Sequence, residues 1–140
     1  MNDKMFKISF FMLSAYFGLS VYFSFFIAPL LFKLLNKNDA GLVVSNIFPS
    51  YFTIGIIAFF ICLIYIMRYA FSSIIAAIIV IAMILLIIQL FYIIPESRVL
   101  KETNYDVFLK LHKWSMVFNI LVILFNFIVI IYMFIRDLNH

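Results

Sequence analysis

The chain has 140 residues, of which 68% are hydrophobic and 11% are charged, and its mean hydropathy is +1.23. A water-soluble fold would lack the polar side chains needed to cover its surface, so the composition excludes an ordinary soluble domain and predicts an integral membrane protein. The net charge of +4 arises from basic residues scattered around the ends of apolar runs, which indicates anionic lipid headgroups and not nucleic acid as the partner. The single cysteine, Cys62, excludes an intramolecular disulfide and a CxxC metal pair.

Four apolar runs follow one another along the chain, and each reaches the roughly 20 residues needed to cross the hydrocarbon of a bilayer. We expect helices at about residues 6–32, 43–67, 69–94 and 114–135. The runs are continuous, whereas the strands of a membrane barrel alternate over about 10 residues. The fold class is therefore predicted as all-α, a polytopic four-transmembrane-helix bundle in which residues 1–140 form a single multi-pass membrane domain.

The first apolar run follows Lys4 and Lys7 and so resembles a signal peptide at first sight. It is longer than the roughly 7 to 15 residues of a signal-peptide core, and no A-x-A cleavage site follows it. We therefore expect this run to be retained as the first helix.

Polar connections separate the four runs. Residues 33–40 join the first two, Arg68 marks a tight turn between the second and third, and the charged residues 95–113 form the one sizeable loop. That loop fits either a short amphipathic helix at the headgroup level or a solvated linker. Four crossings place both termini and the Arg68 turn on one side. Six basic residues on the loop side against four on the terminal side favour cytoplasmic loops without deciding the orientation.

Polar side chains within the apolar runs are the candidates for function, because hydrocarbon offers them no hydrogen-bond partner. The fourth run carries four of them on one helix face, at spacings of 3, 4 and 7 residues: His112, Ser115, Asn119 and Asn126. Gln89 is expected at the depth of Asn119, roughly 8 to 9 Å below the loop-side interface, where the two amides could hydrogen-bond. Such a pair is interpreted first as a structural link between helices, with a ligand or ion path as the alternative.

Single polar positions add further expectations. Tyr16, Ser20 and Ser24 form a stripe that indicates close packing of the first helix against another. Cys62 is interpreted as a buried small apolar residue. His112 lies at the predicted membrane edge, where an imidazole can relay a proton or ligate metal or haem, but it has no second intramembrane histidine as a partner. A structural or interfacial role for His112 is therefore favoured.

Enzymatic motifs are missing from the sequence. It contains no Ser/His/Asp arrangement, glycine-rich phosphate loop, EF-hand or H-E-x-x-H pair. The six acidic residues all fall outside the apolar cores, which argues against a carboxylate-driven transporter. We therefore predict no catalytic residue and no metal ligand set, and we expect the protein not to be an enzyme.

Several short stretches carry a family resemblance. They are residues 28–32 with Leu35, residues 40–41, residues 47–52, and later Phe108, residues 111–112, Ser115 and Asn119. On these stretches the chain resembles, over about residues 10–130, the transmembrane-protein-205-like family of small four-helix membrane proteins, itself a domain of unknown function. The resemblance implies structural motif residues gathered on the loop side: Pro29, Phe32, Gly41, Pro49 and Pro95.

The resemblance and the polar pattern together predict a cleft at the loop-side interface. Pro49 is expected to break the early turn of the second helix and to free carbonyl groups that line this cleft. The candidate ligand-binding residues are His112, Asn119, Gln89, Tyr51, Ser115 and Arg98. The leading hypothesis is a non-enzymatic bundle that binds a small ligand, a lipid or a membrane protein partner, including a second copy of the chain.

Three alternatives stay open. A haem- or quinone-linked membrane oxidoreductase would use His112 as a ligand or proton relay, with haem as the foremost candidate for an unidentified cofactor. An accessory subunit of a larger membrane complex would use the aromatic content, 20% of the chain, for protein and lipid contacts. A metal-handling protein is implied by the resemblance, because eukaryotic relatives have been associated with metal-drug tolerance.

Overall fold

The computed structural model describes residues 3–138, and this part of the chain is helical apart from short turns. The helices form four long rods, two of which contain a π-helical turn, written η. The first rod is α1 (Asp3–Tyr22), η1 (Phe23–Ile27) and α2 (Ala28–Leu34); the second is α3 (Lys37–Tyr69); the third is α4 (Ser73–Ile88), η2 (Gln89–Ile93) and α5 (Ile94–Thr103); the fourth is α6 (Tyr105–Leu138). All four are long and apolar enough to cross a membrane. The predicted all-α four-helix bundle is confirmed.

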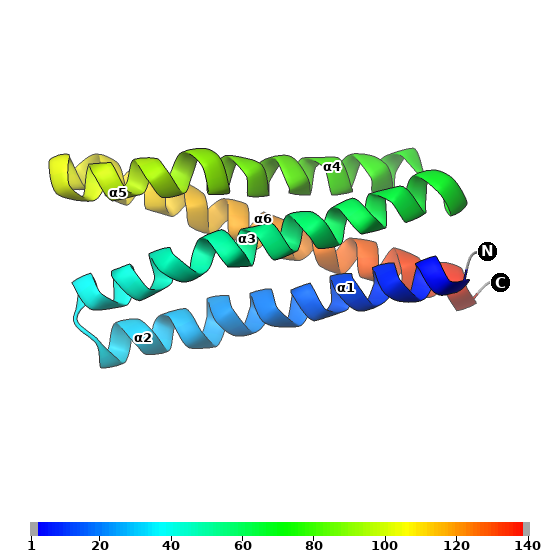
Figure 1. Cartoon of the computed structure of the whole chain (residues 1–140), viewed down its shortest axis with the longest axis horizontal. Coiled ribbons are helices and arrows are strands. Elements are labelled where there is room, and N and C mark those ends of the chain that lie inside the picture. Colours follow the sequence, from blue (N-terminus) through cyan, green and yellow to red (C-terminus); the bar gives the residue numbers. More distant parts are fainter. Residues whose placement is uncertain (1–2, 139–140) are drawn as a thin grey trace.

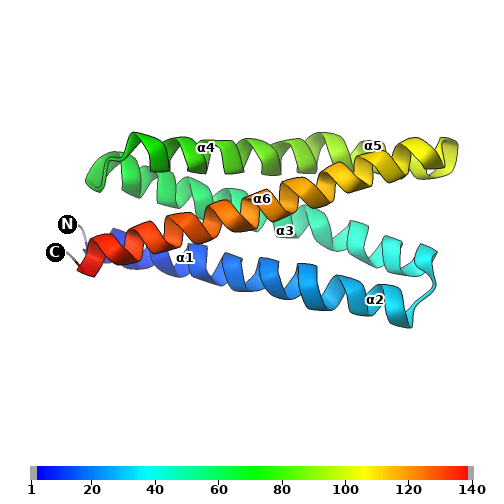
Figure 2. The same cartoon turned by 180° about the vertical axis from the view of Figure 1, so that it is seen from behind.

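The rods lie side by side along the long axis of the molecule (Figure 1). α1 begins and α6 ends where the α3–α4 turn lies, which we call the terminal end, and the α2–α3 and α5–α6 turns lie at the opposite, loop end. Figure 2 shows α6 crossing the bundle from α5 at the loop end toward α1 at the terminal end. On the other face α3 runs from α2 to α4. Each crossing helix therefore packs against both the first and the third rod.

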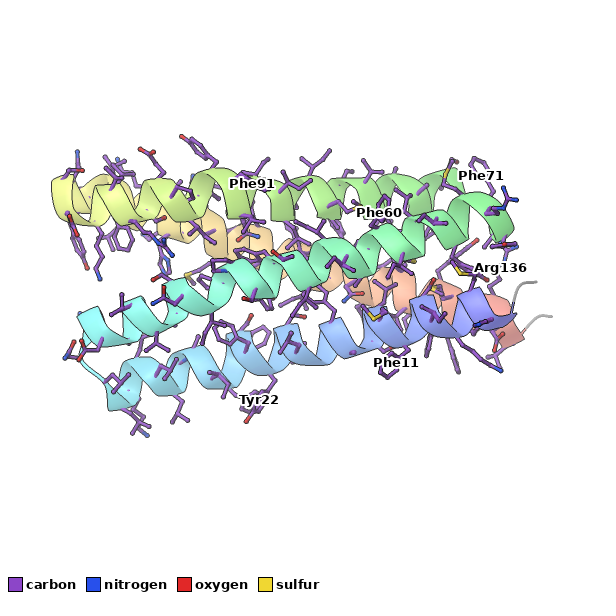
Figure 3. The ribbon with its side chains drawn as sticks, in the orientation of Figure 1. Phe11, Tyr22, Phe60, Phe71, Phe91 and Arg136 are labelled. Atoms are coloured by element: carbon purple, nitrogen blue, oxygen red, sulfur yellow. The ribbon has the colours of Figure 1, made fainter. Side chains whose placement is uncertain are left out.

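Apolar side chains cover the outside of the bundle as well as its inside. Only 17% to 33% of the residues in the apolar window of each rod are buried. Large rings such as those of Phe11, Phe71 and Phe91 point outward from the ribbon, at 69%, 67% and 73% exposure (Figure 3). Exposure of so much apolar surface to water is unfavourable, whereas the same surface is compatible with the hydrocarbon of a bilayer. The outer surface is therefore of the kind that contacts lipid.

Close helix packing within the core depends on Gly55. A Cβ atom at this position would lie 2.5 Å from Cζ of Tyr16, whose side chain is almost completely buried. The Tyr16 ring also meets the Phe59 ring edge-on, with 6.1 Å between the centroids. Because Gly55 has no side chain, α3 can approach α1 closely enough to hold this ring between them.

The polar segment 95–113, expected as a loop, is helical on both sides of Asn104. α5 extends the third rod to Thr103, and α6 begins at Tyr105. The Asn104 side chain accepts a hydrogen bond from the Val107 N–H and so caps the start of α6. Of the two alternatives for this segment, the helix is therefore present and the solvated linker is not. Hydropathy left both open because it marks where a helix leaves the apolar region, not where its backbone hydrogen bonds end. The tight turn expected near Arg68 is present between Tyr69 and Ser73.

Both π-helical turns lie immediately before a proline. The Ala28 N–H donates to the Phe23 carbonyl just before Pro29, and the Ile94 N–H donates to the Gln89 carbonyl just before Pro95. Proline lacks an N–H, so the regular hydrogen-bond pattern is already interrupted at these points. The wider turn inserts one extra residue and changes the direction of the side chains that it contains.

Candidate functional site

A chain of hydrogen bonds joins three rods inside the bundle. The Tyr51 hydroxyl on α3 donates to Oδ1 of Asn119 on α6 over 2.8 Å. Nδ2 of Asn119 donates in turn to Oγ of Ser24 in η1, also over 2.8 Å. Asn119 thus uses both ends of its amide to connect the first, second and fourth rods.

A second polar pair lies one helical turn away on α6. Oγ of Ser115 donates to Oε1 of Gln89 in η2 over 3.0 Å, which links the fourth rod to the third. The Gln89 side chain is completely buried, and its Nε2 has no hydrogen-bond partner among residues 3–138. We call these residues the polar cluster: Ser24, Tyr51, Gln89, Ser115 and Asn119.

The hydrogen bond expected directly between Gln89 and Asn119 is replaced by bonds to other partners. Gln89 pairs with Ser115, and Asn119 pairs with Tyr51 and Ser24. The depth estimate assumed a straight α-helix, whereas Gln89 begins a π-helical turn that changes the direction of its side chain. The expected link between the third and fourth rods is present, but through a serine.

Aromatic rings enclose the first-rod side of the polar cluster. The Tyr51 ring lies 5.5 Å from the Tyr16 ring and 5.7 Å from the Phe23 ring, measured between centroids. Phe48 stacks on Phe52 next to them at 5.2 Å. The hydroxyl of Tyr16 is buried and makes no hydrogen bond of good geometry to any described residue. The cluster therefore has apolar walls and a second buried polar atom beside it.

Deeper polar groups lie toward the terminal end. Nδ2 of Asn126 donates to the Leu13 carbonyl over 3.2 Å, so this side chain links α6 to α1. Cys62 is buried as expected, with its sulfur 3.7 Å from that of Met133. The described residues contain no group of three or more His, Cys, Asp or Glu side chains that could hold a metal ion.

At the loop end, Arg98 interacts with the helix that contains Pro49. Nη2 of Arg98 donates to the Ser45 carbonyl over 3.2 Å. In a regular helix this carbonyl would accept the N–H of residue 49, which proline lacks. Pro49 therefore leaves the Ser45 carbonyl without its usual backbone donor, as expected, and Arg98 of α5 donates to this carbonyl instead. Lys101 of the same helix reaches Gly41 on α3.

The remaining candidate residues lie apart from the polar cluster. His112 is half-buried and stacks on Phe108 of its own helix, with 5.9 Å between the ring centroids. No hydrogen bond of the described chain connects His112 to the cluster. Pro29, Phe32 and Pro95 are exposed on the outer surface. The structure thus brings four candidate ligand-binding residues into two hydrogen-bonded pairs one helical turn apart on α6, Tyr51 with Asn119 and Gln89 with Ser115, and places His112 and Arg98 elsewhere.

Sequence reasoning missed two parts of this arrangement. Ser24 was expected only as a packing residue, yet it accepts a hydrogen bond from Asn119. The π-helical turns were not expected; their one sequence signal is a proline six residues after Phe23 and after Gln89.

Comparisons with known proteins give a family without an activity. The model of a family described as a domain of unknown function, DUF4149, matches residues 11–106, a range that contains Ser24, Tyr51 and Gln89. An uncharacterised protein of Aquifex aeolicus (strain VF5) is 40% identical over 118 residues, which cover 84% of this chain and 88% of that protein. No solved structure matches the chain significantly.

Proposed function

Because the chain belongs to the DUF4149 family, whose function is unknown, we propose a function from the geometry of its polar cluster. The protein is a multi-pass membrane protein that binds a small, uncharged, carbonyl-bearing molecule inside its bundle and performs no reaction on it. Four rods long and apolar enough to span a bilayer support the location. The cluster itself consists of hydroxyl and amide groups, which bind and orient a ligand but supply no general base.

The observation that carries this proposal is the unpartnered amide of Gln89. Its Nε2 is buried and finds no acceptor among the described residues, although Oε1 of the same side chain is bonded to Ser115. A buried donor without a partner costs about 1 to 3 kcal/mol. A ligand carbonyl oxygen at this position would satisfy it, and the buried Tyr16 hydroxyl, whose ring lies beside that of Tyr51, is a second potential donor.

The ligand is expected to be uncharged because the polar cluster contains no charged side chain. A charge placed there would lose its hydration without gaining a counter-charge. An apolar molecule with a carbonyl group, such as a quinone or an acylglycerol, would pay no such penalty and could pack against the rings of Phe23 and Tyr51.

The test is thermal stabilisation of the detergent-solubilised protein by two probes, dioctanoylglycerol and decylubiquinone. A ligand that binds only the folded state raises the melting temperature, and the stabilisation grows with the logarithm of the ratio of its concentration to its Kd. We expect at least one probe to stabilise the wild type and Tyr65→Phe, but not Gln89→Met. Tyr65 is the matched control because its hydroxyl is also buried and unpartnered, but outside the cluster.

Two outcomes would contradict the proposal. If neither probe stabilises the wild type, the cluster serves to hold the helices together. If Gln89→Met responds as strongly as the wild type, the probe binds elsewhere.

Two finer assignments belong to the same proposal. We infer a resemblance to the transmembrane-protein-205-like proteins, for which the motif residues Pro29, Pro49, Tyr51 and His112 are the support. Association with a membrane protein partner or a second copy stays a prediction, for which the exposed aromatic rings offer surface.

A further inference from the structure

A groove at the loop end lies on the outer side of α6, away from the polar cluster. It is lined by Lys110, Lys113, Trp114 and Val117 and has a volume of about 300 Å³. The spacings of 3, 4 and 7 residues place all four side chains on one face of the helix. We call this feature the lysine groove.

The lysine groove combines unpaired positive charge with exposed apolar surface. Lys110 and Lys113 are exposed, and neither forms an ion pair or hydrogen bond with any residue in the described part of the chain. Trp114 and Val117 are 59% and 45% exposed, respectively. The two ammonium groups therefore lack a counter-charge from the described residues, and the apolar side chains beside them are only partly covered by other parts of the protein.

The order of these side chains along α6 matches the order of groups in a phospholipid. Lys110 and Lys113 belong to the polar first part of the helix, and Val117 belongs to the apolar part that follows. Trp114 lies between them, at the position that tryptophan prefers at the boundary between headgroups and hydrocarbon. A phosphate held by the lysines would thus have its acyl chain directed toward Val117.

We propose that the lysine groove is a binding site for an anionic glycerophospholipid. The phosphate and the anionic headgroup lie against Lys110 and Lys113, and the glycerol and first acyl carbons lie against Trp114 and Val117. Lysine is suited to this task because its ammonium group binds phosphate as a compact charge. The inference rests on the proposed membrane location but not on ligand binding at the polar cluster.

A second pair of lysines at the same end provides the matched control. Lys33 and Lys37 are also exposed, but they lie on either side of the α2–α3 turn and not on one helix face. Lys37 also has the carboxylate of Asp39 in the same first turn of α3. Loss of these two charges changes the net charge of the loop end equally without changing the groove.

Trp114 makes the experiment specific, because it is the one tryptophan of the chain. The protein is reconstituted in phosphatidylcholine vesicles that contain a minor fraction of phosphatidylglycerol, and bromine is carried on the acyl chains of one lipid at a time, at equal mole fraction. Quenching of Trp114 fluorescence then reports which lipid occupies the groove.

We expect brominated phosphatidylglycerol to quench the wild type more strongly than brominated phosphatidylcholine. The preference should fall about fivefold for each lysine removed in Lys110→Gln and Lys113→Gln, and disappear in the double variant. The variant Lys33→Gln/Lys37→Gln should keep it.

Equal quenching by the two lipids in the wild type would overturn the proposal. An equal loss of preference in the Lys33→Gln/Lys37→Gln variant would also overturn it, since the effect would then come from the general surface charge. The two single variants keep the test decisive if the double variant reconstitutes poorly.

Discussion

The bundle consists of two helical hairpins that use the same backbone features with different side chains. The first hairpin is α1 to α3, and the second is α4 to α6. In each, a π-helical turn precedes a proline, and an asparagine then caps the returning helix. Tyr51 and Asn119 occupy corresponding positions, each 15 residues after the capping Asn36 or Asn104. These two residues hydrogen-bond to each other.

The difference lies in what each π-helical turn directs toward the core. The first turn presents Phe23, which packs edge-on against Phe48 at 5.6 Å between centroids. The second turn presents Gln89, which bonds to Ser115. The backbone thus fixes where a side chain enters the core, and the residue type decides whether that place is aromatic or polar. The polar cluster arises because the second hairpin uses amides where the first uses rings.

The largest loss of stability is expected from Gly55→Ala, which changes packing within the first hairpin alone. The new Cβ would collide with the Tyr16 ring, and overpacking of this kind costs about 2 to 3 kcal/mol. Gly18→Ala is the control, because no atom lies within 4 Å of its Cβ position. Unfolding by SDS titration measures both. Equal stability of the two variants would show that α1 and α3 can separate without cost.

Asn119→Leu should have the next largest effect, because it breaks two of the hydrogen bonds that link the hairpins. It removes two hydrogen bonds, whereas Tyr51→Phe removes one. At about 0.6 to 1 kcal/mol for each bond in a membrane protein, we expect losses of about 1 to 2 kcal/mol for Asn119→Leu and half of that for Tyr51→Phe. The same titration measures them. A larger loss of stability for Tyr51→Phe than for Asn119→Leu would contradict the assignment of one hydrogen bond to Tyr51 and two to Asn119.

Pro49 has no counterpart in the second hairpin, where Val117 occupies the corresponding position. Arg98→Ala should therefore destabilise the protein by about 1 kcal/mol, since the Ser45 carbonyl loses its donor. In a Pro49→Ala background the restored N–H can bond to that carbonyl, so removal of Arg98 should have almost no effect. A double-mutant cycle on unfolding free energies checks this. The same loss in both backgrounds would show that Arg98 acts through other contacts.

The smallest effects should come from the two asparagine caps. Asn36→Ala and Asn104→Ala each remove a side-chain acceptor for the N–H three residues later. We expect about 0.5 to 1 kcal/mol for each, with the larger loss for Asn36→Ala, because its bond to the Asp39 N–H is 2.9 Å long and that of Asn104 to the Val107 N–H is 3.3 Å. Hydrogen exchange at Asp39 and Val107 measures the local loss. A larger loss for Asn104→Ala would contradict this order.

The four rods were predictable because each is a continuous apolar run, and such a run is visible in consecutive residues without knowledge of the fold. The inward polar positions Gln89 and Asn119 were also predictable, since helical spacing identifies a shared face. Their partners were not, because one extra residue in a π-helical turn redirects a side chain without altering the hydrophobic pattern. For residues 95–113 the sequence left a helix and a linker as alternatives for a related reason, since polar residues continue a helix as readily as apolar ones.

At the terminal end, the α3–α4 turn is closed by the fourth rod. Nη2 of Arg136 donates to the Tyr69 carbonyl over 3.2 Å, and the Tyr132 hydroxyl donates to the Ala70 carbonyl over 3.3 Å. Arg136 is translated 67 residues after Tyr69. During synthesis the hydrogen bonds from Tyr132 and Arg136 to this turn can therefore form only after the last rod is inserted. A nascent chain halted before residue 132 would lack both of these hydrogen bonds.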